Sequence, residues 1–399
     1  MGKQLKDAYI VSAVRTPVGR APRGMFKNVR PDDLLVRALR GILEKNPQLD
    51  PRDIDDVVMG CAVPEGEQGA DIARAAALLA GFPESVPGVT LNRFCSSGLQ
   101  SVAAAANSIK VGEADIVIAG GVESMSTLPM YGIKPSFNPA VFDDEKKTGM
   151  AYSMGIGAEL IAGERNISRE DQDGYSLQSH RKALAAIEKG EFKGEILPFT
   201  VVQSLPDAEK GEVIEKKRTV DTDEGPRPET SMEALGKLRP VFDVRGSVTA
   251  GNSSQMSDGA AAVLLCSGEA VKKYGFTPMA RFAGYSVSAV KPEYFTIAPV
   301  KAIPKVLKLT GLSLDDFDWI ELNEAFASQS LAVIRDLDLD MENINPLGGA
   351  IALGHPLGCT GAKLTATLVH GMKRRNIRFG MVTMCVGFGM GAAGVFELA

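Results

Sequence analysis

Histidine and cysteine are scarce in this chain of 399 residues, which contains three histidines and five cysteines. Because imidazole and thiol groups supply many of the nucleophiles and metal ligands in proteins, these eight residues limit where such chemistry can occur. The cysteines are odd in number and form no C-x-x-C pair, so the sequence predicts neither a disulfide framework nor a metal site. We expect a reducing, cytoplasmic environment.

Aromatic residues make up only 6% of the chain, and basic charge is not in excess. The formal net charge of −5 argues against a dedicated nucleic-acid-binding protein, which is normally basic. The longest uncharged stretch near the C-terminus, residues 380–396, contains too many glycines for a membrane span. Residues 1–7 contain no apolar core of a signal peptide, and the last residues form no peroxisomal address.

Glycine is abundant, with 42 residues, beside a hydrophobic content of 45% that is typical of a folded protein. Short β-branched runs alternate with alanine-rich helical patterns, which predicts an α/β fold. Residues 55–60 and 115–121 are predicted to be strands. Between them, the apolar residues Leu99, Val102, Ala103, Ala106 and Ile109 follow helical spacing.

A similar order of elements returns in the last third of the chain. Residues 315–322 resemble residues 53–59, a glycine-rich turn leads into a helix at 348–368, and a strand at 380–385 ends in glycines. This repetition predicts two similar halves about a pseudo-twofold axis, and a chance likeness of two α/β patterns is the alternative. Residues 122–250 are more polar, include a helix start at Ser168, and are predicted to cover a site.

Three of the eight scarce residues occur in settings that favour chemistry. Cys95 stands at the start of a helical pattern, where backbone amides lower a thiol pKa and hold an oxyanion. His355 lies among glycines and precedes a proline, and Cys385 ends a strand that runs into glycines. For each cysteine, a buried structural thiol is the alternative. The G-x-G-x-x-G beginning at Gly389 is no dinucleotide site, because only five residues follow it.

The remaining histidines and two of the cysteines give no such signal. His180 and His370 fall in polar helical patterns and are predicted to be surface residues, whereas Cys61 and Cys266 lie in apolar runs and are predicted to be inert. Two further segments have the character of a binding site: residues 323–327 (Asn-Glu-Ala-Phe-Ala) and the small-residue turn at 248–254.

Taken together, four blocks resemble the thiolase family in order and spacing. They are residues 92–100 (Asn-Arg-Phe-Cys-Ser-Ser-Gly-Leu-Gln), 323–327, the Gly-His-Pro block at His355 and the Cys-x-Gly-x-Gly block at Cys385. The resemblance runs over nearly the whole chain. It implies a five-layer α-β-α-β-α fold built from two similar halves, residues 1–269 and 276–399, with an inserted loop domain at about 122–250. It also implies a homodimer or a homotetramer.

The resemblance further implies a two-stage acyl transfer. Cys95 would hold the acyl group as a thioester, His355 would take the proton of Cys95, and Cys385 would move the proton at the α-carbon of the acetyl unit. Asn323 would complete one oxyanion site with His355 through a water. The backbone N–H groups of Cys95 and Gly387 would form the second oxyanion site.

Coenzyme A is implied as a substrate, and no tightly bound cofactor is expected. The family pattern suggests that CoA contacts Ser254 and Ala250 in the small-residue turn, Ala325 and Phe326 in the second block, and Arg227 in the loop domain. A guanidinium such as that of Arg227 matches the geometry of nucleotide phosphates.

The subclass favoured by the sequence is a degradative 3-ketoacyl-CoA thiolase of fatty-acid β-oxidation, with a multifunctional β-oxidation subunit as a possible partner. Ser153 stands where biosynthetic enzymes usually carry histidine, and Leu357 and Cys359 also resemble the degradative type. A biosynthetic acetoacetyl-CoA thiolase is the first alternative. A decarboxylating ketoacyl synthase is disfavoured by Cys385, and a non-catalytic acyl-CoA-binding or lipid-binding protein by the presence of all four blocks.

Overall fold

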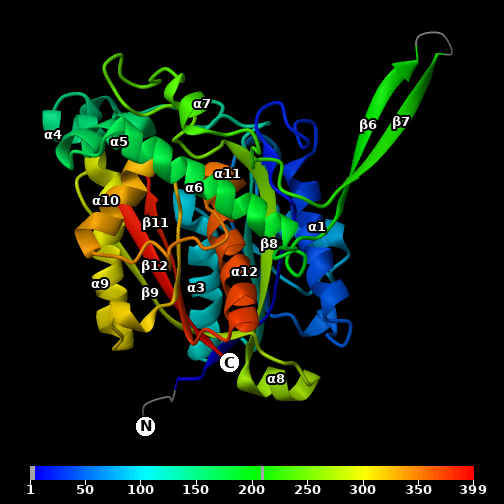
Figure 1. The fold of residues 1–399 in the computed structure, drawn as a ribbon. Coiled ribbons are helices and arrows are strands. Elements are labelled where there is room, and N and C mark those ends of the chain that lie inside the picture. Colours follow the sequence, from blue (N-terminus) through cyan, green and yellow to red (C-terminus); the bar gives the residue numbers. More distant parts are fainter. Residues whose placement is uncertain (1–4, 208–210) are drawn as a thin grey trace.

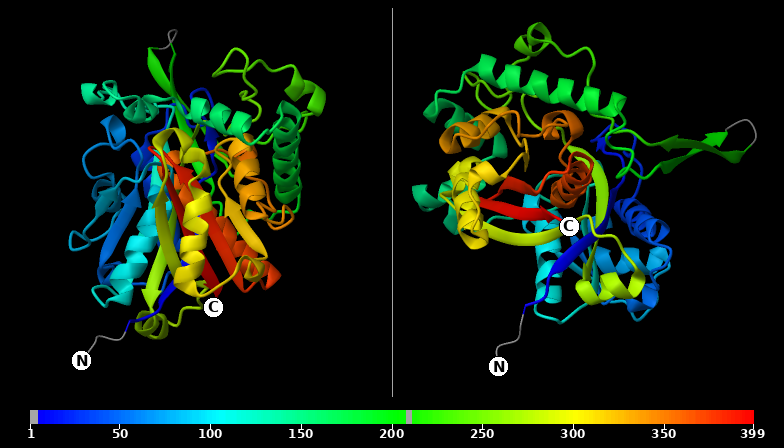
Figure 2. Two further views of the ribbon diagram at one scale, coloured as in Figure 1. Left: turned by 90° about the vertical axis from the view of Figure 1, so that its left-hand side faces the viewer. Right: turned by 60° about the horizontal axis from the view of Figure 1, so that its bottom comes forward.

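The computed structural model describes residues 5–207 and 211–399, and its strands form one hydrogen-bonded series that bends into two sheet layers (Figures 1 and 2). The first layer has β3 in parallel pairing with β4 and β5, and β8 in antiparallel pairing with β5 and β1. The two-residue strand β2 pairs with β8. The bounds of these strands are β1 (Ala8–Arg15), β2 (Gly19–Arg20), β3 (Asp56–Gly60), β4 (Val89–Leu91), β5 (Ile116–Ser124) and β8 (Ser257–Ser267).

The second layer repeats this order and direction. In it, β10 runs parallel to β11, and β12 pairs antiparallel with both β11 and β9. Two residue pairs between β1 and β9 connect the two layers. The bounds are β9 (Ala280–Ala289), β10 (Trp319–Leu322), β11 (Phe379–Val386) and β12 (Met390–Leu398). The predicted repetition is therefore present, and it includes the 3-10 turns Pro51–Asp53 and Leu314–Asp316, which precede β3 and β10.

Two helices, α3 (Ser97–Lys110) and α12 (Leu357–Arg375), fill the space between the sheet layers (Figures 1 and 2). Glycines let these helices touch backbone to backbone: a Cβ on Gly98 would lie 2.7 Å from the amide nitrogen of Ala362. A Cβ on Gly361 would lie 2.1 Å from the amide nitrogen of Leu99. Because side chains at these contacts would force the helices apart, the glycines place the two N-termini side by side.

Helices on the outer faces complete five layers, which confirms the predicted thiolase-like fold. Helices α1 (Pro31–Lys45) and α2 (Ile72–Ala80) share a hydrophobic cluster with the first sheet, and α9 (Pro299–Thr310) and α10 (Ala327–Leu337) share one with the second. A third cluster joins α3 and α12 to both sheets. The short helix α8 (Gly268–Tyr274) leads from β8 towards β9.

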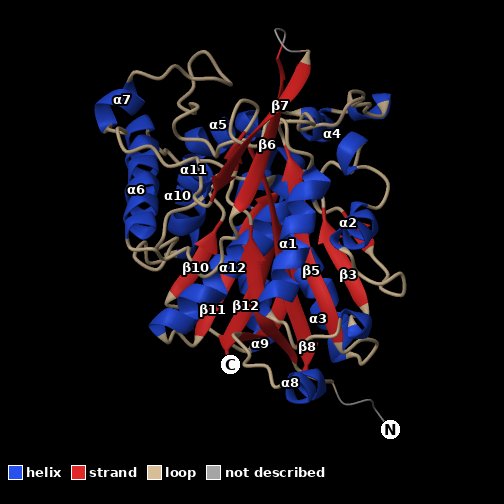
Figure 3. Ribbon diagram, turned by 90° about the vertical axis from the view of Figure 1, so that its right-hand side faces the viewer, coloured by secondary structure: helices blue, strands red, loops and turns tan. Residues whose placement is uncertain are grey.

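The segment between β5 and β8 lies across one end of this layered body (Figures 1 and 3). It contains α4 (Glu145–Thr148), α5 (Met154–Glu164), α6 (Arg169–Glu188) and α7 (Met232–Gly236). The hairpin of β6 (Phe199–Asp207) and β7 (Glu212–Val220) projects away from the body. Ser168 caps α6 through a reciprocal capping box with Asp171, as the sequence predicted. Within the described ranges, no helix is long and apolar enough to cross a membrane.

Candidate active site

Cys95 lies in a single 3-10 turn, Phe94–Ser96, that leads directly into α3. The side chain of Asn92 accepts a hydrogen bond from the Phe94 N–H at 2.8 Å, and the hydroxyl of Ser97 accepts one from the Arg93 N–H at 2.8 Å. Phe94 has a φ of 43°, which is unusual for a bulky residue. The turn is thus held in a strained form, which is typical of functional sites.

Two backbone N–H groups, those of Gly387 and of Cys95 itself, lie near the sulfur of Cys95. Burial raises the pKa of this thiol to about 12, while hydrogen bonds from the N–H groups of Gly387 and of Cys95 itself act to lower it. The same two donors are suited to an oxyanion on a carbonyl bonded to this sulfur. The structure therefore brings together the two N–H groups that the sequence resemblance assigned to one oxyanion site.

His355 is fixed by its neighbours on both sides. Gly354 has a φ of 85°, and a Cβ there would lie 2.4 Å from the hydroxyl of Ser257, so this close turn requires glycine. The imidazole Nδ1 lies 2.6 Å from the hydroxyl of Thr360, which donates its own proton to the carbonyl of Pro356 at 2.8 Å. Since that hydroxyl has no second proton, Nδ1 carries the hydrogen and Nε2 is left as an acceptor.

Asn323 lies on the Nε2 side of this imidazole. Its amide Nδ2 is 3.3 Å from Nε2, and its Oδ1 is buried without a protein partner. Burial, together with the charge of Lys363, lowers the pKa of His355 to about 3, so the free imidazole is neutral. The site thus contains a proton acceptor beside an unsatisfied amide oxygen, which is suited to hold a water.

Cys385 is the last residue but one of β11 and lines the same pocket as Cys95 and His355. Burial raises its pKa well above the ordinary value, and the nearby Cys95 acts in the same direction. A pocket brings Cys95, His355 and Cys385 together. Its lining residues are Phe94, Cys95, Met130, Tyr131, Met154, Ser254, Phe295, Ala325, Phe326, His355, Leu357, Cys385, Gly387 and Phe388.

The residues expected to contact CoA divide between two pockets. Ser254, Ala325 and Phe326 line the pocket with the thiols, whereas Arg227 and Ala250 line a neighbouring one. The Ser254 N–H donates to the carbonyl of Ala325 at 2.9 Å, which connects the small-residue turn to the second block. The two pockets therefore adjoin along one turn, and an elongated ligand could occupy both.

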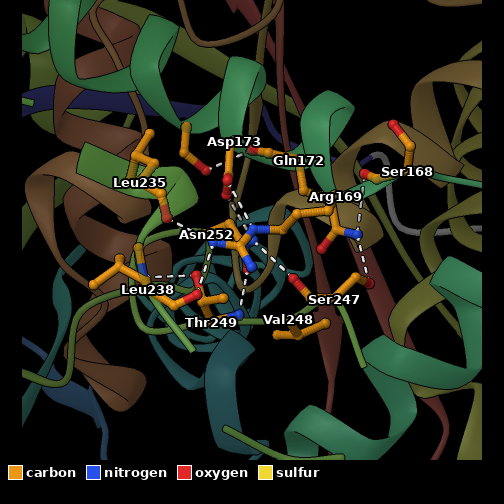
Figure 4. A network of polar contacts seen from close by, with 12 residues as sticks. Ser168, Arg169, Gln172, Asp173, Leu235, Leu238, Ser247, Val248, Thr249 and Asn252 are labelled. Carbon is orange, nitrogen blue, oxygen red and sulfur yellow. Dashed lines mark hydrogen bonds and ion pairs between the residues drawn. The ribbon is translucent and has the colours of Figure 1, made fainter. Parts of the chain in front are cut away.

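A polar network holds this turn against α6 (Figure 4). The side chain of Asn252 donates to Asp173 at 3.0 Å and accepts from the Thr249 N–H at 2.7 Å. Arg169 forms an ion pair with Asp173 at 2.7 Å and donates to the carbonyl of Leu235 at 2.6 Å. The loop domain thereby fixes the backbone that separates the two pockets.

One sequence prediction about the histidines was wrong. His180, expected at the surface, is only 5% exposed and lines the second pocket, where its Nδ1 accepts from the Arg227 N–H at 3.2 Å. Burial and then Arg227 lower its pKa to about 4. His370 is half-buried and its Nε2 lies 2.9 Å from the carbonyl of Ala13. Both lie on helices whose polar faces are covered by chain segments distant in sequence.

Sequence reasoning missed the buried carboxylate of Glu123 and, for Glu324 in the 323–327 block, the partners that hold it. Glu123 accepts from the N–H groups of Ala62 and Gly358, both at 2.8 Å, and so ties the end of β3 to the start of α12. Glu324 accepts from Ser179 at 2.7 Å and from the Ile351 N–H at 3.1 Å. Their polar character was visible in the sequence, but their partners lie far along the chain.

No group of three or more His, Cys, Asp or Glu residues arranged to hold a metal ion occurs in the parts of the chain that the structure describes. The free cysteines are Cys61, Cys95, Cys266, Cys359 and Cys385. The residues of the site supply two thiols, an imidazole, an amide and two backbone N–H groups.

Comparison with known proteins places these features in a family. The thiolase N-terminal domain model matches residues 8–269 and the thiolase C-terminal domain model matches residues 276–398. A 3-ketoacyl-CoA thiolase of Bacillus subtilis is 51% identical over 99% of this chain and 100% of its own length. A peroxisomal 3-ketoacyl-CoA thiolase 2 of Arabidopsis thaliana is 48% identical over 98% of this chain and 84% of its own.

Solved structures agree with this assignment. Human mitochondrial 3-ketoacyl-CoA thiolase in complex with CoA is 40% identical, covers 100% of both chains and has a TM-score of 0.88. The acetyl-CoA acetyltransferase of Bacillus anthracis is 38% identical, with the same coverage and a TM-score of 0.88. From its sequence, its fold and the geometry of its site, this chain belongs to the thiolase family.

Proposed function

We propose that this chain cleaves 3-ketoacyl-CoA with free CoA to give acetyl-CoA and a shortened acyl-CoA, and that the reaction runs in reverse as a Claisen condensation. The observation that carries this proposal is one pocket in which Cys95, Cys385 and His355 meet two convergent N–H groups. The names of the relatives at 44–51% identity support the same reaction.

The first stage begins with proton transfer from the thiol of Cys95 to Nε2 of His355, the nitrogen that its tautomer leaves unprotonated. The thiolate attacks the C3 carbonyl of the substrate, and the N–H groups of Cys95 and Gly387 stabilise the oxyanion. The bond between C2 and C3 then breaks. Its electron pair passes to C2, whose enolate accepts a proton from the thiol of Cys385 and leaves as acetyl-CoA.

The enolate oxygen needs its own donors while C2 carries the electron pair. The imidazolium N–H at Nε2 of His355 would serve, together with a water held by Asn323 Oδ1, because the Asn323 amide lies 3.3 Å from that nitrogen. In the second stage the thiolate of Cys385 takes the proton of free CoA. The CoA thiolate attacks the acyl group on Cys95, and the Cys95 sulfur leaves and recovers its proton from His355.

CoA would bind across both pockets. Arg227 and Ala250 would contact the nucleotide end, where a guanidinium matches phosphate oxygens. Ser254, Ala325 and Phe326 would contact the end that carries the thioester. The CoA complex of the human relative supports binding of this ligand, and we expect no tightly bound cofactor.

We further propose a role in fatty-acid β-oxidation in the cytoplasm, as a homodimer or homotetramer with a possible multifunctional β-oxidation subunit as partner. A biosynthetic acetoacetyl-CoA thiolase is the second candidate, since a solved structure named acetyl-CoA acetyltransferase shares the fold at 38% identity. The higher identity to 3-ketoacyl-CoA thiolases favours the degradative role.

The experiment that separates the two is thiolysis of 3-ketoacyl-CoA substrates of 4, 8 and 16 acyl carbons by the purified protein. The degradative role predicts cleavage of the longer substrates. Cleavage confined to the acetoacetyl substrate would overturn that role and favour the biosynthetic one. No cleavage of any substrate would favour a binding protein, and turnover of a malonyl thioester would favour a ketoacyl synthase.

A further inference from the structure

Phe388 is held in a backbone conformation that aromatic residues rarely adopt. It has a φ of 60°, in the left-handed region where the Cβ crowds the following carbonyl oxygen. Glycine would occupy this position without that strain, and Gly387 and Gly389 stand on either side. The aromatic side chain therefore costs folding free energy relative to glycine.

The side chain of Phe388 is only partly buried. Phe388 remains 40% exposed and lines the pocket of the two reactive thiols. Its ring contacts Phe94 edge-on, with centroids 5.2 Å apart, and lies 6.5 Å from the ring of Phe137. Phe94, the residue before Cys95, is also at positive φ, at 43°. Two strained aromatic residues thus present their rings beside the nucleophile.

Aromatic residues are more frequent in the lining of this pocket than in the chain as a whole. Five of its fourteen lining residues are aromatic, against 6% of the sequence. Met130 and Leu357 add apolar surface from the loop domain and from α12. The strained backbone and the exposed aromatic side chain in this pocket lining indicate a surface that binds apolar groups rather than one that stabilises the fold.

The pantetheine arm of CoA is a poorer match to this pocket lining than an alkyl chain. Pantetheine carries amide groups that need hydrogen-bond partners when they leave water, and the side chains of Phe94, Phe388 and Leu357 offer none. An alkyl chain needs no such partner, and each methylene that it buries favours binding. The acyl chain beyond C3 is the part of the substrate that fits.

We propose that Phe388, supported by Phe94, is a specificity-determining residue that binds the alkyl chain of 3-ketoacyl-CoA and favours medium and long chains over acetoacetyl-CoA. This inference rests on the proposed thiolase function. It assigns the chain-length preference of the site to one aromatic side chain in the turn that follows Cys385.

The test compares wild type, Phe388→Gly, Phe388→Asn and the control Phe142→Ala. Both residues placed at position 388 tolerate the left-handed conformation. Phe142 is 61% exposed and lies outside the pocket lining. For each protein, kcat/KM is measured on acetoacetyl-CoA, 3-ketooctanoyl-CoA and 3-ketododecanoyl-CoA, together with the KM for CoA and the urea midpoint of unfolding.

In both variants at position 388, we expect the ratio of kcat/KM for the 12-carbon substrate to that for the 4-carbon substrate to fall about tenfold or more. The urea midpoint of unfolding of Phe388→Gly should be no lower than that of wild type. Loss of a side chain that only stabilised the fold would lower this midpoint. The ratio in Phe142→Ala should match wild type.

Equal losses at every chain length, or a raised KM for CoA at an unchanged ratio, would overturn the inference, because Phe388 would then contact CoA or support the site generally. A higher kcat/KM for the 12-carbon substrate in the variants at position 388 would also overturn it, since the ring would then obstruct long chains rather than bind them. If the wild-type protein cleaved none of the three substrates, the proposed function itself would be contradicted.

Discussion

The hydroxyl of Thr360 lies 2.6 Å from Nδ1 of His355 and donates its only proton to the carbonyl of Pro356. This arrangement assigns the imidazole hydrogen to Nδ1 and leaves Nε2 to accept the proton of Cys95. Thr360 is therefore a positioning residue, which acts through the imidazole and is not itself among the residues that line the pocket.

Replacing Thr360 by valine should lower kcat about tenfold or more, because the imidazole loses the partner that fixes its tautomer and orientation. Thr360→Ser keeps the hydroxyl and should recover most of the rate. The KM for CoA should change by less than about threefold, since ground-state binding is unaffected. Steady-state thiolysis kinetics of both variants provide the check, and equal rates for the valine and serine variants would contradict the assignment.

Asn323→Ala should lower kcat/KM by about 10²–10³-fold, because it removes the amide beside Nε2 of His355 and the unsatisfied Oδ1 that would hold a water. Alkylation of Cys95 by iodoacetamide should persist, which would show that the turn at Cys95 is intact. Steady-state thiolysis and alkylation rates are the measurements. A thiolysis rate within about twofold of wild type would remove Asn323 from the oxyanion site.

Glu123→Gln should lower the free energy of unfolding by about 2 kcal/mol. Both carboxylate oxygens accept from N–H groups, Oε1 from Gln68 at 2.6 Å and Oε2 from Ala62 at 2.8 Å. Whichever way the new amide turns, its NH₂ group meets an N–H donor. Urea unfolding measures the loss. The control Glu269→Gln, at an exposed ion pair with Lys6, should change stability by less than about 0.5 kcal/mol, and equal effects of the two would contradict the account.

Acid should destabilise the protein in part through His180. Its pKa is lowered from 6.5 to about 4, by burial first and then by Arg227. Between those pH values the unfolded chain binds a proton that the folded chain does not, so this contribution to stability is present above pH 6.5 and is lost as the pH falls towards 4. Between pH 7 and pH 5, His180→Asn should lose about 2 kcal/mol less of its free energy of unfolding, measured with urea, than wild type loses. An equal loss of free energy of unfolding in wild type and His180→Asn would show that His180 does not titrate in this way.

Much of the fold followed from local patterns. The apolar spacing after Cys95 predicted α3, and all five of its named apolar residues are buried. The repeat of strand, glycine turn, helix and strand predicted two similar halves, and the second set of strands repeats the order of the first. These features depend on periodicity and turn chemistry within short windows, which a sequence displays directly.

Other features depend on contacts between distant segments and had no local signal. His180 looked like a surface residue because its helix is polar, yet the loop that carries Arg227 covers it. The partners of Glu123 include Gly358, 235 residues away. Thr360 is the exception, since a hydroxyl five residues after His355, near the start of α12, was a signal that could have been found.

The most direct test of the mechanism is the identity of the acylated residue. After incubation with acetyl-CoA, peptide mass mapping should find an acetyl group on Cys95 and none in Cys95→Ser. Cys385→Ser should still acylate Cys95 while cleavage and formation of the carbon–carbon bond fail. An adduct on Cys385, no adduct on either thiol, or equal loss of both half-reactions in Cys385→Ser would contradict the division of roles between the two cysteines.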